Sequence, residues 1–153
     1  MASYNKITND EVLLLEFQER NTRDAESMFA PYNGISITEA GPEGARGELL
    51  VSTHSLNPHG LVHGGALAAL ADTVGGAATY AAYRQGCVTV NYSLSFLRPA
   101  GGNNQKIRCL ATPVQLGNRL CVYRMSLTDD QAREVATGNF TFYLTGWMAS
   151  PKN

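Results

Sequence analysis

The sequence predicts an α+β fold in which one antiparallel sheet of six strands wraps around a single long helix. Three observations support this prediction. An apolar run without proline covers residues 64–84, a segment of strict two-residue alternation follows it, and further strand-like segments lie on both sides. The predicted order is a helix, two strands, the long helix and four strands. A sheet curled around the apolar helix satisfies that order within one domain, residues 1–153.

The first predicted element is a helical segment over residues 8–30, which opens with a capping box formed by Thr8 and Glu11. We expect its second, shorter helix to end at Phe29, because Pro31 disfavours helical geometry in the residue before it. The apolar side chains at this end either cover the core or shape a pocket: Met28, Phe29 and Tyr32.

Strands are predicted at residues 35–39 and 46–53, around a turn at residues 41–44. Residues 88–96 alternate apolar and polar side chains and form the clearest strand of the chain. Thr89 belongs to the polar row, so we expect it on the face opposite the apolar row. The remaining strands are expected at residues 107–115, 120–128 and 134–145.

Asp72 is the one charged residue between Gly64 and Tyr83, in a helix that is expected to be buried on all sides. A buried carboxylate is costly unless it is paired or protonated, so its presence needs a reason. Its neighbours one turn away are all small: Ala68, Ala69, Gly75 and Gly76. Asp72 is therefore either a structural carboxylate satisfied by hydroxyls or amides, or a catalytic acid or base.

The start of this helix is a second candidate site. Gly64 and Gly65 leave backbone N–H groups unshielded at the positive end of the helix dipole, where an anion or a developing oxyanion can bind. An ordinary tight helix start would have the same sequence. His63 is expected to cap the helix or brace the loop before it.

The stretch from Asn57 to Gly76, NPHGLVHGGALAALADTVGG, resembles the hotdog-fold acyl-CoA thioesterases, most closely the PaaI-like, phenylacetate-type branch. The resemblance covers roughly residues 29–146 and continues in VTVNY at residues 88–92 and LRPA at residues 97–100. It implies a hotdog fold that hydrolyses acyl-CoA without a further cofactor. It also implies a homo-oligomer, with a tetramer built as a dimer of dimers.

The resemblance implies roles for single residues. Asp72 would act as general base or nucleophile, and the Gly64 N–H would hold the oxyanion. Asn57 would donate to the carbonyl or orient water, and Thr89 would help to place water. Further substrate contacts are expected from four residues, of which the two arginines would bind the phosphates of coenzyme A: His63, Gly65, Arg98 and Arg119.

The spacing along the helix indicates whether one chain can supply all the residues of an active site. Gly64 and Asp72 are eight residues apart, which is about 12 Å at the rise of an α-helix. One thioester carbonyl cannot contact both. We therefore expect each site to combine Asn57 and Gly64 of one subunit with Asp72 and Thr89 of its two-fold mate, as the resemblance also implies.

Composition argues against several classes of function. The net charge of −1 gives no electrostatic case for nucleic acid or an anionic membrane as partner. The polar N-terminus has no apolar signal region, and three cysteines without CxxC spacing are expected to be reduced, so we expect a cytoplasmic protein. His54, His59 and His63 lack the spacing of a metal site, and none is expected.

Two other functions share these features. A hotdog dehydratase or hydratase would pair a catalytic histidine with an acid on the helix. A non-catalytic acyl-CoA-binding or sensing module would retain the pocket without turnover. The presence of Asn57, Gly64 and Asp72 together favours the thioesterase.

Overall fold

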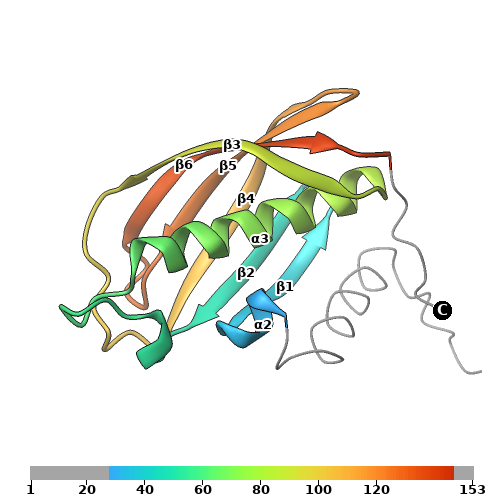
Figure 1. The fold of residues 1–153 in the computed structure, drawn as a ribbon. Coiled ribbons are helices and arrows are strands. Elements are labelled where there is room, and N and C mark those ends of the chain that lie inside the picture. Colours follow the sequence, from blue (N-terminus) through green and yellow to red (C-terminus); the bar gives the residue numbers. More distant parts are fainter. Residues whose placement is uncertain (1–27, 147–153) are drawn as a thin grey trace, which may run out of the picture.

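The computed structural model describes residues 28–146, so most of the predicted N-terminal helical segment, residues 8–27, lies outside the described residues. Six antiparallel strands form one sheet that curls around the helix α3 (Gly64–Tyr83), as Figure 1 shows. This is the α+β architecture that the sequence predicts. Within the described residues, no helix is both long and apolar enough to cross a membrane.

The strand order in the sheet is β1-β2-β4-β5-β6-β3. The bounds are β1 (Ile35–Gly41), β2 (Gly44–Leu50), β3 (Cys87–Phe96), β4 (Lys106–Leu116), β5 (Leu120–Thr128) and β6 (Glu134–Leu144). β2 ends three residues before the predicted strand does, because the chain turns into the 3-10 helix η1 (Thr53–Ser55), where the Ser52 hydroxyl accepts a hydrogen bond from the His54 N–H. β1 and β3 are the two edges of the sheet.

The short helix before β1 does not end where the sequence predicts. The helix α2 (Phe29–Tyr32) contains Pro31, so the prediction that it stops at Phe29 is wrong. Proline is tolerated in a first helical turn, because the N–H groups of that turn have no intrahelical acceptor. The Asn33 side-chain amide then closes the turn by donating to the Phe29 carbonyl at 2.7 Å.

α3 packs one side against the sheet and leaves the other side open. Its buried residues include Leu67, Leu70, Ala71, Val74, Gly75 and Ala78. Gly75 permits the close approach, since a Cβ there would lie 2.5 Å from both Met125 Cε and Phe142 Cζ. On the open side Gly65 is exposed, and Asp72 and Gly76 are half-buried. The prediction that the helix is buried on all sides is therefore wrong for a single chain.

A β-bulge in β3 decides which face Thr89 occupies. The register between β3 and β6 shifts around Val90, which leaves this residue without a partner in the ladder. Thr89 pairs with Phe142 and Tyr92 pairs with Phe140, and both phenylalanines are buried in the core. Thr89 therefore lies on the same face as Tyr92, and the prediction that it lies on the opposite face is wrong.

The turn between β5 and β6 is built around Asp129, which is 1% exposed. Its carboxylate accepts hydrogen bonds from the Gln131 and Arg133 N–H groups and pairs with the Arg133 guanidinium. Burial alone would raise the pKa of Asp129, but these hydrogen bonds and the charge of Arg133 hold it below its ordinary value. The carboxylate therefore stabilises the turn in its charged form.

Candidate active site

The start of α3 offers one free backbone donor. His63 is the N-cap, and its Nδ1 accepts a hydrogen bond from the Gly65 N–H at 2.8 Å. The His63 carbonyl accepts from the Ala66 N–H at 2.9 Å and from the Leu67 N–H at 3.2 Å. Among the described residues, none accepts a hydrogen bond from the Gly64 N–H. The Gly64 N–H is therefore free to donate to a ligand, and it lies at the positive end of the helix dipole.

The ring of Phe96, at the end of β3, lies over this helix start. A Cβ added at Gly64 would lie 3.4 Å from Phe96 Cζ, and the ring itself is 55% exposed. Phe96 thus forms an apolar wall beside the free N–H. Nothing in the sequence marks Phe96 as a site residue, because the contact between the end of β3 and the start of α3 has no local sequence signal.

Asn57 fixes the loop that leads into the helix. Its Oδ1 accepts hydrogen bonds from the His59 N–H at 2.9 Å and the Leu61 N–H at 3.1 Å. The loop is closed by a hydrogen bond of 2.7 Å from the His63 N–H to the Ser55 carbonyl. Because the side-chain oxygen is used within the loop, the Nδ2 amide of Asn57 is the group that can donate to a ligand.

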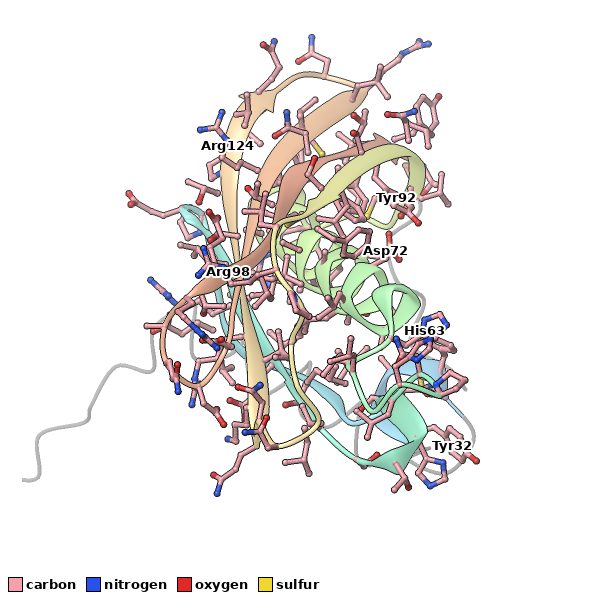
Figure 2. The ribbon with its side chains drawn as sticks, turned by 90° about the vertical axis from the view of Figure 1, so that its left-hand side faces the viewer. Tyr32, His63, Asp72, Tyr92, Arg98 and Arg124 are labelled. Carbon is pink, nitrogen blue, oxygen red and sulfur yellow. The ribbon has the colours of Figure 1, made fainter. Side chains whose placement is uncertain are left out.

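Asp72 and Thr89 meet on the open side of α3. The Thr89 hydroxyl donates to Asp72 Oδ1 at 2.5 Å, from the face of the sheet on which the β-bulge places Thr89. Figure 2 shows Asp72 on the same side of the molecule as His63 and Tyr92, whereas Arg124 projects from the other side. Asp72 is half-buried and forms no ion pair with any residue in the range 28–146. A partly buried carboxylate without a cation is available for chemistry.

The cysteines do not compete with Asp72 as nucleophiles. All three are free, with Cys109 and Cys121 buried and Cys87 half-buried. Burial raises the pKa of Cys87 to about 11 and that of Cys109 to about 12, and it also raises the pKa of Cys121. These thiols therefore stay protonated at neutral pH, where they are poor nucleophiles.

The predicted site residues form two groups within one chain. Asn57, His63 and Gly64 lie at the start of α3, and Asp72 and Thr89 lie two turns further along. Eight residues of helix separate Gly64 from Asp72 by about 12 Å. These two groups of predicted site residues, which we call the half-sites, therefore do not meet within the single chain.

The two arginines predicted to bind phosphates also lie far apart. The Arg98 N–H donates to the Val135 carbonyl at 3.4 Å, whereas the Arg119 carbonyl accepts from the Leu144 N–H at 2.8 Å. Val135 and Leu144 lie at opposite ends of β6, about 30 Å apart at the rise of a strand. Arg98 follows Phe96 and lies at the Gly64 end, so one chain does not bring both arginines to one phosphate group.

A cavity of about 150 Å³ lies beside the helix start, between α2, η1 and α3. Its lining includes Phe29, Ile35, Leu49, His54, His63 and Ala69. Of the three residues predicted to shape a pocket, only Phe29 lines this cavity, while Met28 and Tyr32 are exposed beside it. In the part of the chain that the structure describes, no three His, Cys, Asp or Glu side chains are grouped to hold a metal.

Comparison with known proteins identifies the family. The sequence model described as Thioesterase superfamily matches residues 59–136. The chain is also 30% identical to the proofreading thioesterase EntH of Cronobacter turicensis over 113 residues, which are 74% of this chain and 82% of EntH. The chain therefore belongs to the thioesterase superfamily and is a thioester hydrolase by family.

Solved structures agree on the fold. The PaaI protein of the E. coli phenylacetic acid degradation operon superposes with a TM-score of 0.76 at 24% identity, covering 90% of this chain and 96% of PaaI. A hypothetical thioesterase from Streptococcus pneumoniae TIGR4, solved with coenzyme A, gives a TM-score of 0.69 at 24% identity, covering 75% and 88% of the two chains. These likenesses confirm the predicted hotdog fold.

Proposed function

We propose that this thioesterase hydrolyses acyl-CoA to a free acid and coenzyme A, with Asp72 as the reacting carboxylate. One observation carries the proposal: Asp72 is half-buried on the open side of α3, has no cationic partner among residues 28–146, and is held there by the Thr89 hydroxyl. The relative solved with coenzyme A supports the choice of leaving group. The acyl group can be aryl, short or medium in chain length.

Hydrogen bonds support the roles that we propose for these residues. Thr89 occupies Oδ1 of Asp72 and leaves Oδ2 to take a proton from water, or to attack the thioester carbon itself. When water attacks, the carbonyl oxygen becomes an oxyanion, which the Gly64 N–H and the Asn57 Nδ2 amide stabilise. Collapse of this intermediate breaks the C–S bond, and the departing thiolate takes up the proton that Asp72 holds. When Asp72 attacks instead, the thiolate departs and takes a proton from solvent, and the mixed anhydride left behind is hydrolysed by water to the free acid and the Asp72 carboxylate.

The two half-sites require a second chain, and β3 offers the surface for it. Among the described strands β3 pairs only with β6, so its other edge is unpaired over ten residues. Four large apolar side chains of this strand are each about half exposed: Val88, Val90, Tyr92 and Phe96. A long apolar edge of this kind favours pairing with another strand. The proposal is that a second copy pairs here about a two-fold axis.

The register of this pairing decides whether the half-sites meet. With the two-fold axis at Ser93, and with Val90 left out of this ladder as it is left out of the ladder with β6, Thr89 of one chain lies opposite Phe96 of the other. Thr89 holds Asp72, and Phe96 covers Gly64. This register would therefore bring Asp72 of each chain next to Gly64 of its partner. Two such dimers would form the tetramer that the resemblance implies.

The phosphates of coenzyme A are assigned to Arg98, which lies at the Gly64 end of the molecule, is exposed, and forms no ion pair within residues 28–146. Arg119 lies at the far end of β6 and would serve the same site only from the partner chain. An Arg98→Gln variant is expected to raise KM for acyl-CoA more than it lowers kcat, because it removes binding that substrate and transition state share.

Thiol release from a panel of aryl, short-chain and medium-chain acyl-CoA thioesters tests the proposed function. We expect turnover of at least one class by the native chain and none above background by Asp72→Asn. Tight binding of acyl-CoA without thiol release would instead identify a non-catalytic binding module. Hydration of an enoyl-CoA without thiol release would identify a hydratase.

A further inference from the structure

His63 controls how many backbone donors the helix start presents. Of the N–H groups of residues 64 to 67, three have acceptors: Gly65 donates to His63 Nδ1, and Ala66 and Leu67 donate to the His63 carbonyl. The ring nitrogen accepts this hydrogen bond only when it carries no proton, so the neutral ring holds its proton at Nε2. The one donor left over is the Gly64 N–H, which is the group proposed to bind the oxyanion.

We propose that His63 is a positioning residue, whose neutral imidazole fixes the Gly64 N–H as oxyanion donor and makes turnover sensitive to acid. This inference rests on the proposed function. Protonation of Nδ1 would set its N–H against the Gly65 N–H, so the ring would have to rotate away and the cap would be lost. The first turn of α3 would then no longer be fixed, and the Gly64 N–H would lose its defined orientation.

The surroundings of His63 contain few other groups that could cause the same pH dependence. It lines the cavity between α2, η1 and α3, where the described lining residues include one other titratable side chain, that of His54, and no carboxylate. From α2, Tyr32 packs its ring 6.4 Å from that of His54. From the preceding loop, His59 is exposed and contributes its backbone N–H to Asn57. His63 and His54 are therefore the two imidazoles that the experiment has to separate.

Three variants separate capping from direct action on the substrate. His63→Ala removes the cap, and we expect kcat to fall about tenfold, which is the scale of a lost N-cap. His63→Asn supplies a side-chain oxygen that caps a helix well and does not titrate. It should recover most of the activity that His63→Ala loses and should lack the decline of kcat across the imidazole range. His54→Gln should keep that decline.

Two measurements decide the inference. The first is kcat and KM for the native chain and the three variants between about pH 5 and 8, the imidazole range. The second is the amide resonance of Gly65 by NMR, which should titrate in the native chain and not in His63→Asn. Activity of His63→Asn as low as that of His63→Ala would overturn the inference, because the imidazole would then act on the substrate itself. A Gly65 resonance that does not titrate in the native chain would also overturn it. Absence of thiol release by the native chain would refute the proposed function instead.

Discussion

A proline at position 64 removes the proposed oxyanion donor while disturbing the fold little. Gly64 is the first residue of α3, a position where proline is common because the N–H that it lacks has no intrahelical acceptor. The preceding residue, His63, already has the extended backbone that proline requires of its neighbour, with φ of −64° and ψ of 135°. The added Cβ would meet the Phe96 ring at 3.4 Å, an ordinary contact distance. Gly64→Pro should therefore fold.

The loss expected in Gly64→Pro is that of one oxyanion donor, a fall in kcat of about 100- to 1,000-fold. The assay is thiol release at saturating acyl-CoA, with a melting curve to confirm folding. Gly64→Ala is the matched control, since it adds the same Cβ and keeps the N–H, and it should stay within a few-fold of the native rate. Equal kcat in the proline and alanine variants, both folded, would refute the assignment of the Gly64 N–H.

Three further predictions concern the carboxylates and the core. Asp72→Asn keeps an acceptor for the Thr89 hydroxyl and removes the charge, so kcat should fall at least about 100-fold in single-turnover assays while the melting temperature holds. Gly75→Ala should unfold with a free energy about 1–3 kcal/mol lower than Gly76→Ala, because only at Gly75 would the methyl group overlap Met125 and Phe142. The pKa of Asp129 is lowered in the folded state, so its stabilisation is present above the ordinary pKa of an aspartate and is lost as pH falls through the lowered value. Urea titrations at a series of pH values from neutral to acidic give the free energy of unfolding. This free energy should fall less steeply with pH in Asp129→Asn than in the native chain, and an equal pH dependence in both would contradict this assignment.

The sequence predicts the fold well because hydrophobic periodicity records which side of each element is buried. The apolar run predicts α3 to within one residue, and Arg84 then ends the helix in the left-handed conformation with φ of 56°. The turn at residues 41–44 separates β1 and β2 as predicted. Some boundaries differ from the prediction: β2 ends three residues early, and α2 continues through Pro31, whose effect depends on where in the helical turn it falls.

The candidate site is harder to predict, because it depends on tertiary contacts and on one irregularity. Strict alternation puts Thr89 on the face away from Tyr92, and only the bulge at Val90 brings its hydroxyl to Asp72. No spacing rule reveals that Phe96 covers Gly64. The open side of α3 is likewise hidden from the sequence, because an apolar composition does not tell which sides of a helix the sheet covers.

The central claim is that each site combines Gly64 of one chain with Asp72 of its partner, and mixed dimers test it. Gly64→Pro and Asp72→Asn are each expected to be nearly inactive as homodimers. Refolded together in equal amounts, half of the dimers should be mixed, and each mixed dimer should hold one intact site and one doubly damaged site. Thiol release should then recover to about a quarter of the native rate. No recovery, with mixed dimers verified by mass spectrometry, would contradict the claim and place the whole site within one chain.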